Sequence, residues 1–130
     1  MPALDAFSHL SLTVTDPERS ADFYNRVLGT ETMFSSADDT GRLIIVARPG
    51  VMIALCGHPG TTDQSFDPVR IGLDHVAFQV PSRADLEAWH TNLAAAGVPC
   101  SEIEVSPFGL HLNLKDPDNI AIELFVSEPS

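Results

Sequence analysis

Polar and apolar residues alternate along two short segments of the chain, at residues 8–15 and 74–80. Alternation with a period of two is typical of a strand that buries one of its faces. The polar face carries His9, Ser11 and Thr13 in the first segment, and the matching positions of the second segment are His75, Ala77 and Gln79. The apolar residues between them must pack against another element, and a helix after each strand is the expected cover.

Each predicted strand leads into a predicted helix. Asp16 and Pro17 supply an N-cap and a favoured first helical residue, and Gly29 ends the first helix. Ser82 begins the second helix with a capping box, and Gly97 takes the place that Gly29 has in the first half. The apolar stripes consist of Ala21, Tyr24, Val27 and Leu28 in the first helix and of Leu86, Trp89, Leu93 and Ala96 in the second.

Short apolar runs separated by turn residues follow each helix. They cover residues 43–47 and 51–56 in the first half and residues 110–114 and 120–126 in the second. Each half is therefore predicted to form a βαβββ unit, and the chain contains an internal repeat. We expect an α+β fold and one domain over residues 1–130, with modules at about 5–57 and about 73–127 and a linker at about 57–72.

The polar faces of the predicted strands are too polar for a core and are expected to line a cavity. The last strand alternates in the same way, which turns Glu123 to the same side as His9 and His75. Two histidines and one carboxylate are the ligand set of a facial-triad site, which binds divalent Fe or Mn with open positions and also suits Zn with water. A hydrogen-bonded polar cavity without metal is the alternative.

Further polar residues are expected on this cavity face. His111 is a candidate general acid or base, because imidazole titrates close to neutral pH, and a plain hydrogen-bonding role is the alternative. The expected substrate-binding residues are Ser11, Thr13, Gln79, Asn113 and Phe125. The basic residues nearest the cleft by sequence are Arg42, Arg48, Arg70 and Lys115; each can hold an anionic substrate or be a solvated strand-end charge.

Composition narrows the class of partner. Apolar residues make up 44% of the 130 residues and charged residues 19%, which suits a folded domain. The formal charge of -11 opposes nucleic acid and anionic lipid, so we expect a small-molecule partner and neither nucleic acid nor membrane. Residues 1–8 lack the features of a signal peptide, which predicts a cytoplasmic protein with Cys56 and Cys100 as reduced thiols.

Three segments that span nearly the whole chain carry a family resemblance: SHLSLTVTDPERSADFYNRVLG, LDHVAFQV and KDPDNIAIELF. They resemble the vicinal oxygen chelate superfamily, which groups glyoxalase I, extradiol dioxygenases, fosfomycin-resistance enzymes and bleomycin-resistance proteins. The resemblance implies two βαβββ modules whose curled mixed sheets surround a metal cleft. It also implies a homodimer in which His9 of one chain joins His75 and Glu123 of the other.

The metal ligands of that superfamily correspond here to His9, Ala54, His75 and Glu123. Ala54 stands where glyoxalase I has a carboxylate, so the resemblance favours the three-ligand sites of extradiol dioxygenases and fosfomycin-resistance transferases. Both of those groups have a tyrosine where this chain has Asn113, so neither specific reaction carries over intact.

Two functions follow as hypotheses. The first is a metal-dependent enzyme with catalytic Glu123 and His111, which chelates a vicinal-oxygen substrate on a divalent ion. Fe would allow dioxygenase chemistry, whereas Mn, Zn or Ni would suit an isomerase, lyase or transferase. The second is a metal-free ligand-sequestering protein of the bleomycin-resistance type, for which the acidic charge would suit a cationic drug.

Overall fold

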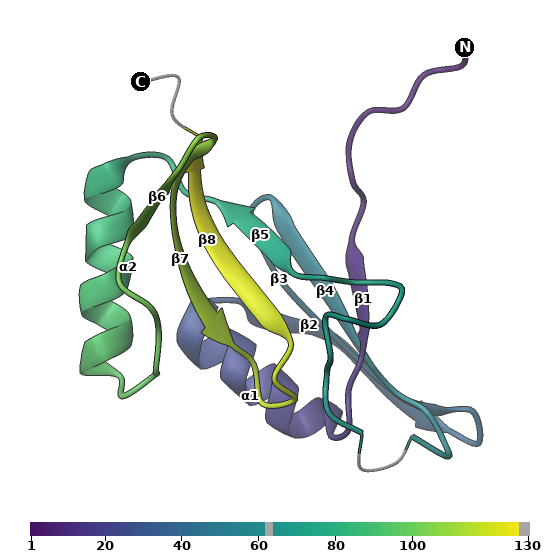
Figure 1. The fold of residues 1–130 in the computed structure, drawn as a ribbon. Helices are drawn as coiled ribbons and strands as arrows, with labels where there is room; N and C mark the ends of the chain where they lie inside the picture. Colours follow the sequence, from purple (N-terminus) through teal and green to yellow (C-terminus); the bar gives the residue numbers. More distant parts are fainter. Residues whose placement is uncertain (62–63, 128–130) are drawn as a thin grey trace. The chain divides into compact units, whose positions relative to one another are not determined.

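Each half of the chain folds into its own βαβββ unit, shown as a ribbon in Figure 1. The structure is a computed structural model that describes residues 1–61 and 64–127. Residues 62 and 63 of the predicted linker and residues 128–130 of the predicted domain lie outside the described part. The first unit comprises residues 1–64 and the second residues 65–130, and each is described by itself.

The first unit is a four-stranded mixed sheet with one helix. Its elements are β1 (Leu10–Thr13), α1 (Pro17–Leu28), β2 (Glu31–Asp38), β3 (Gly41–Arg48) and β4 (Val51–Gly57). The strand order is β1-β4-β3-β2, in which β1 runs parallel to β4 and the other pairs are antiparallel. The predicted βαβββ order is therefore present.

Helix α1 begins and ends where the sequence predicts. The Asp16 carboxylate accepts hydrogen bonds from the backbone N–H groups of Glu18 (3.1 Å) and Arg19 (3.3 Å), which are among the first N–H groups of the helix and have no partner inside it. Gly29 ends the helix at φ 73°, a left-handed conformation that glycine adopts without strain. All four residues of the predicted apolar stripe of this helix are buried. The stripe therefore forms the contact of α1 with the sheet.

The second unit repeats this arrangement with a shorter second strand. Its elements are β5 (Val76–Gln79), α2 (Arg83–Ala95), β6 (Glu104–Ser106), β7 (Gly109–Lys115) and β8 (Ala121–Ser127). The strand order is β5-β8-β7-β6, with β5 parallel to β8. The strand order of the first unit thus recurs in the second.

Helix α2 is less buried than α1. The Ser82 side chain accepts a hydrogen bond from the Asp85 N–H at 3.2 Å, which confirms Ser82 as the N-cap, and the Ser82 hydroxyl donates to the Asp85 carboxylate at 2.6 Å. Leu86 and Leu93 are fully buried, whereas Trp89 is half-buried and Ala96 is exposed. The predicted stripe is therefore wrong at Ala96, because the helix ends at Ala95 and Ala96 is its C-cap.

Strands β7 and β8 show why the second sheet has one apolar and one polar face. The alternate residues Leu110, Leu112, Leu114, Ile120, Ile122, Leu124 and Val126 are all buried, as predicted. The residues between them are mostly half-exposed and include His111, Asn113 and Glu123. This second set makes up the open face of the sheet, which carries the candidate site.

The segment before β5 belongs to the second unit. The Phe66 N–H donates to the Asp118 carbonyl oxygen at 3.2 Å, and the Asn119 side chain donates to Ser65 Oγ at 3.1 Å. The later part of the predicted linker is thus tied to the β7–β8 turn. Among the described residues, no helix is long and apolar enough to cross a membrane.

Candidate functional site

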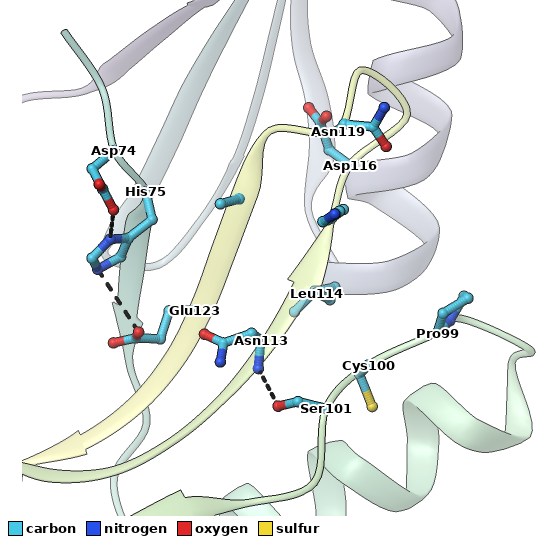
Figure 2. Close-up of a pocket in the computed structure, with 12 residues that line it drawn as sticks. Asp74, His75, Pro99, Cys100, Ser101, Asn113, Leu114, Asp116, Asn119 and Glu123 are labelled. Atoms are coloured by element: carbon cyan, nitrogen blue, oxygen red, sulfur yellow. Dashed lines mark hydrogen bonds and ion pairs between the residues drawn. The ribbon is translucent and has the colours of Figure 1, made fainter. Parts of the chain in front are cut away.

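His75 and Glu123 meet on the open face of the second sheet, as Figure 2 shows. His75 directly precedes β5, and Glu123 lies in the neighbouring strand β8, opposite Ala77 in the register. His75 Nε2 lies 3.8 Å from Glu123 Oε2, and the Glu123 side chain is only 18% exposed. A carboxylate this far buried needs a cationic or hydrogen-bonding partner.

The neighbouring carboxylate of Asp74 sets the orientation of the His75 ring. His75 Nδ1 lies 2.8 Å from Asp74 Oδ1, and an ionised carboxylate can only accept, so Nδ1 carries the proton. In the neutral ring, Nε2 then presents a lone pair toward the Glu123 oxygen. Two acceptors 3.8 Å apart can be bridged by a water molecule that donates to both, or by a metal ion that both coordinate.

These residues fit two ligands of a divalent metal. Two donors bound to one ion at about 2.1 Å each lie about 3 to 3.4 Å apart, so a small movement of either side chain closes the pair around an ion. A carboxylate on the second nitrogen of a metal-binding histidine is the usual outer-shell partner, and Asp74 provides it. The chemistry of the donor set therefore suits a metal.

His9, the third predicted ligand, lies just before β1 in the first unit. Its Nδ1 is 2.9 Å from Ser8 Oγ. Across residues 1–61 and 64–127, no three His, Cys, Asp or Glu side chains gather closely enough to hold a metal ion. The second unit thus brings together two of the three predicted ligands, and the complete set stays a prediction.

A pocket of about 680 Å³ opens beside this pair, a volume within the usual range for small-molecule sites. Its walls are formed by Asp74, His75, Pro99, Cys100, Ser101, Asn113, Leu114, Lys115, Asp116, Asn119, Ala121 and Glu123. Asn113 lies directly opposite Glu123 in the β7–β8 register, and its backbone N–H donates to Ser101 Oγ at 2.9 Å. The predicted substrate-binding residue Asn113 is therefore part of the pocket wall.

Two further wall residues have structural explanations. Asp116 is buried, and its Oδ1 accepts the backbone N–H groups of Asp118 (2.8 Å) and Ile120 (2.9 Å), which shapes the β7–β8 turn. Burial, together with the charge of Glu102, raises the pKa of the Cys100 thiol. Cys100 is therefore protonated at neutral pH and is a poor nucleophile there.

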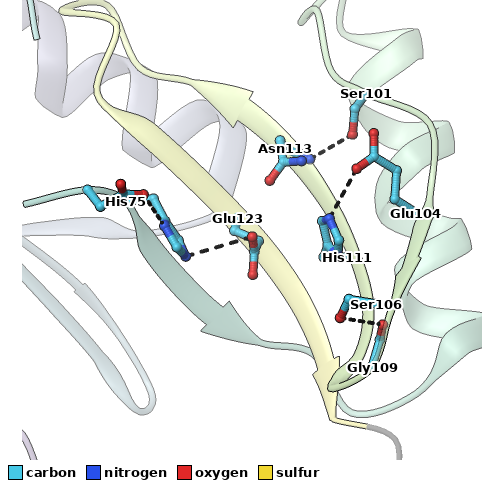
Figure 3. Close-up of polar contacts among 9 residues, drawn as sticks. His75, Ser101, Glu104, Ser106, Gly109, His111, Asn113 and Glu123 are labelled. Atoms are coloured by element: carbon cyan, nitrogen blue, oxygen red, sulfur yellow. Dashed lines mark hydrogen bonds and ion pairs between the residues drawn. The ribbon is translucent and has the colours of Figure 1, made fainter. Parts of the chain in front are cut away.

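His111 has a carboxylate partner of its own, visible in Figure 3. His111 Nε2 lies 3.1 Å from Glu104 Oε2, across the β6–β7 pair, and the His111 side chain is 17% exposed. Glu104 thus holds the proton on Nε2 and leaves Nδ1 as the basic nitrogen. His111 shares the open face with Glu123, as predicted, although it lies outside the pocket wall.

The remaining predicted substrate-binding residues lie outside this pocket wall. Ser11 and Thr13 are exposed on β1 in the first unit. Gln79 accepts a hydrogen bond from Ser127 Oγ at 3.0 Å and donates to the Val80 carbonyl oxygen at 3.1 Å. Phe125 pairs in register with both Gln79 and His111, so it occupies the open face between them. Their part in substrate binding stays a prediction.

Asp74 and Glu104 are partners of candidate site residues that the sequence prediction did not name. Asp74 directly precedes a predicted histidine ligand, and an acidic neighbour of this kind is a readable signal. Glu104 gives no such signal, because its pairing with His111 depends on the register of β6 against β7.

The comparisons with known proteins agree with this fold. The sequence model of the Glyoxalase/Bleomycin resistance protein/Dioxygenase superfamily matches residues 6–124. The chain belongs to this superfamily. The resemblance inferred from the sequence is confirmed, and so is the α+β fold of two βαβββ modules. No curated protein matches the chain.

Solved structures with this fold match nearly the whole length of the chain. A glyoxylase/bleomycin resistance protein/dioxygenase domain from Frankia sp. EAN1pec is 35% identical, with a TM-score of 0.89, and the match covers 97% of this chain and 100% of that one. TnmS3, an antibiotic binding protein from Streptomyces sp. CB03234, is 22% identical, with a TM-score of 0.75 and coverage of 98% and 100%.

A third structure holds a metal. It is a mutant of the fosfomycin resistance protein FosX from Listeria monocytogenes, complexed with Mn(II) and 1S,2S-dihydroxypropylphosphonic acid. It is 20% identical to this chain, with a TM-score of 0.71 and coverage of 98% and 96%. The superfamily fold therefore serves both a metal-binding resistance protein and an antibiotic binder.

Proposed function

We propose that this superfamily member is a metal-dependent enzyme that binds a small molecule through two neighbouring oxygens. His9, His75 and Glu123 hold a divalent ion of Fe, Mn, Zn or Ni in this proposal. The observation that carries it is the His75 pair: Nδ1 is held by Asp74 at 2.8 Å, and Nε2 faces the Glu123 carboxylate at 3.8 Å. A site of this kind serves dioxygenase or lyase and isomerase chemistry.

A divalent ion, when bound, supplies Lewis-acid stabilisation of negative charge on substrate oxygens. The protein contributes a base and a positioned polar wall. His111 and Glu123 are diagonal neighbours on β7 and β8, a spacing of about 7 to 8 Å between backbones that long side chains bridge. His111 Nδ1 accepts the substrate proton, and Glu104 stabilises the imidazolium that forms.

Metal content tests the first part of this proposal. Purified protein is expected to bind up to one divalent ion per chain by elemental analysis, and Glu123→Ala should lower the affinity most among single changes, because it removes the anionic ligand. Metal-free protein with full activity, or a Glu123→Ala variant that binds metal as wild type does, would contradict it.

The role of His111 has a separate test. His111→Gln should keep the metal content and lower turnover at least tenfold, as general acid or base catalysis contributes about 10²-fold or more. Oxygen uptake with catechols and loss of 2-hydroxyketones or epoxyphosphonates are suitable first assays. Unchanged turnover in His111→Gln would make His111 a structural residue.

A ligand-sequestering function is the second candidate. The net charge of -11 suits a cationic ligand, and the antibiotic binder TnmS3 shares the fold. The same metal assay separates the two candidates, because a binder of this type needs no bound ion. Stoichiometric metal supports the enzyme, and its absence together with tight binding of a cationic drug supports the binder.

We also propose a homodimer that works in the cytoplasm. Edge strand β2 exposes Met33 (65%) and Phe34 (51%), and β6 with its following turn exposes Val105 (80%) and Phe108 (78%). Exposed apolar residues on sheet edges favour a covering partner. Free thiols at Cys56 and Cys100 suit a reducing compartment, which fractionation of the host cells checks.

Light scattering and subunit exchange test the dimer. If His9 of one chain completes the site of the other, mixing His9→Ala with Glu123→Ala protein should restore about one intact site per heterodimer, measured as recovered metal binding. A dimer without recovery places all ligands on one chain, and a monomer at micromolar concentration ends the dimer proposal.

A further inference from the structure

The wall of the candidate pocket contains one lysine side chain and several carboxylates. Its acidic wall residues are Asp74, Asp116 and Glu123. Among the wall residues, all of them in the described part of the chain, Lys115 is the only lysine or arginine. It is also the only lysine in the whole sequence. The pocket therefore has a single fixed positive charge at a known position.

The other basic residues near the predicted cleft are committed elsewhere. Arg42 pairs with Glu18, and Arg48 donates to the Leu28 carbonyl oxygen at 2.7 Å. Arg70 lies in the segment before β5 and is not part of the pocket wall. Of the four basic residues that the sequence offered as candidates for binding an anionic substrate, Lys115 is therefore the one that lines the pocket.

Strand register sets the position of Lys115 relative to the metal-binding pair. Lys115 is opposite Ala121, and Asn113 is opposite Glu123, so Lys115 and Glu123 are diagonal neighbours on the same face. The backbones of diagonal neighbours lie about 7 to 8 Å apart. Depending on its rotamer, the Lys115 side chain can extend toward Glu123 or leave space between the two groups. A ligand whose chelating end is held at Glu123 can therefore contact Lys115 with a second group that lies one small ring or a few bonds away from that end.

In the part of the chain that the structure describes, the nearby carboxylates form no ion pair with the Lys115 ammonium. Asp116 is bound to backbone N–H groups, and Asp74 is paired with His75. Within residues 1–61 and 64–127, no hydrogen bond or ion pair holds the Lys115 ammonium or the Asn113 side-chain amide. Both donors are available to a ligand in the pocket.

We propose that Lys115 and the Asn113 amide form an anion-binding subsite. The substrate is then an oxygen-rich small molecule that carries a carboxylate or similar anionic group about one small ring away from its chelating oxygens. This inference rests on the proposed function, since His75 and Glu123 hold the chelating end. It requires a ligand of the opposite charge from the cationic drug considered above.

The single lysine allows a direct test. Reductive methylation with ¹³C-formaldehyde labels Lys115 and the N-terminal amine and keeps their charge. The probes are 3,4-dihydroxybenzoate and its uncharged methyl ester, which share the same vicinal oxygens. The carboxylate probe should shift the Lys115 NMR signal and bind about fivefold to tenfold more tightly than the ester, whereas the ester should leave the signal in place.

Variants connect that preference to Lys115. Lys115→Met should reduce the ratio of the two affinities to about one, and Lys115→Arg should restore most of it. Arg83→Met is the matched control, because it removes a positive charge from an exposed site on α2 that does not line the pocket. It should leave the ratio unchanged.

Metal content, measured on the same samples, separates this inference from the proposed function. Bound metal together with equal affinity for the two probes, or with no binding of either, overturns the subsite and leaves the metal site standing. A carboxylate-specific shift of the Lys115 signal in protein that binds no metal supports the subsite and overturns the metal-dependent enzyme. A ratio that survives in Lys115→Met also overturns the subsite.

Discussion

Asp74 should control how tightly His75 binds a metal ion, although Asp74 itself is not a ligand. Its carboxylate accepts the Nδ1 proton of His75 at 2.8 Å, which fixes the tautomer and raises the basicity of Nε2. Asp74→Ala removes both the hydrogen bond and the charge. Asp74→Asn keeps an oxygen that can accept the same proton and removes only the charge.

The size of the effect follows from the exposure of the pair. Loss of an outer-shell partner typically lowers metal affinity by about 10- to 100-fold. The Asp74 side chain is 76% exposed, so water competes for the Nδ1 proton and the lower limit applies. We expect about a tenfold loss in Asp74→Ala, or about 1.4 kcal/mol, and about a threefold loss in Asp74→Asn, since a neutral hydrogen bond is about half as strong.

Calorimetric titration of metal-stripped protein with Zn²⁺ or Mn²⁺ measures these affinities directly. Glu123→Gln, which removes the charge of a ligand, should lose far more than either Asp74 variant. Glu87→Gln removes another exposed carboxylate, from α2, and serves as the control for overall charge. The reasoning is refuted if Asp74→Ala binds as tightly as wild type, or if Glu87→Gln loses as much as Asp74→Ala.

Three further predictions concern stability and reactivity. Leu112 is fully buried in β7, so Leu112→Ala should lower the free energy of unfolding by about 2 to 5 kcal/mol in urea titrations. The side-chain and backbone hydrogen bonds from Thr40 lower the pKa of Asp38, so its stabilising contribution is present above about pH 4 and is lost as the pH falls below it. In Asp38→Asn, the melting temperature should therefore fall less steeply at acid pH than in wild type. The raised pKa of Cys100 predicts slow alkylation at neutral pH, which Glu102→Gln should speed up in peptide mass spectrometry.

Each of these predictions has an outcome that contradicts it. A loss below about 1 kcal/mol in Leu112→Ala would mean that the β7 core repacks around the cavity. If Asp38→Asn and wild type lose stability equally as the pH falls, the hydrogen bonds from Thr40 to Asp38 are not the cause of that loss. Alkylation of Cys100 at the rate of a small thiol would show that burial does not suppress its thiolate.

Local sequence signals were sufficient for the helices and the inner strands. Asp16 and Ser82 predicted the helix starts, because a cap involves only residues within one turn of each other. The alternation around Glu123 predicted which face of β8 is buried, since side chains along a strand alternate whatever the strand pairs with. The shared face of Glu123 and His111 followed from the same rule.

The edge strands β2 and β6 gave no such signal. The sequence prediction assigned no residues to β2 or β6, although it counted three strands after each helix. Nearly all residues of β2 are exposed, so the segment has no contrast between a buried and an open face. These strands form because their neighbours β3 and β7 offer unpaired backbone groups, which is a property of the assembled sheet.

The sequence alone determined the βαβββ repeat and the residue types of the site, because both depend on short-range periodicity. The tertiary structure decided which of those residues work together. Glu104 holds His111, and Lys115 lines the pocket while Arg42 pairs with Glu18. These choices depend on strand register and on side-chain packing, which exist only once the chain has folded.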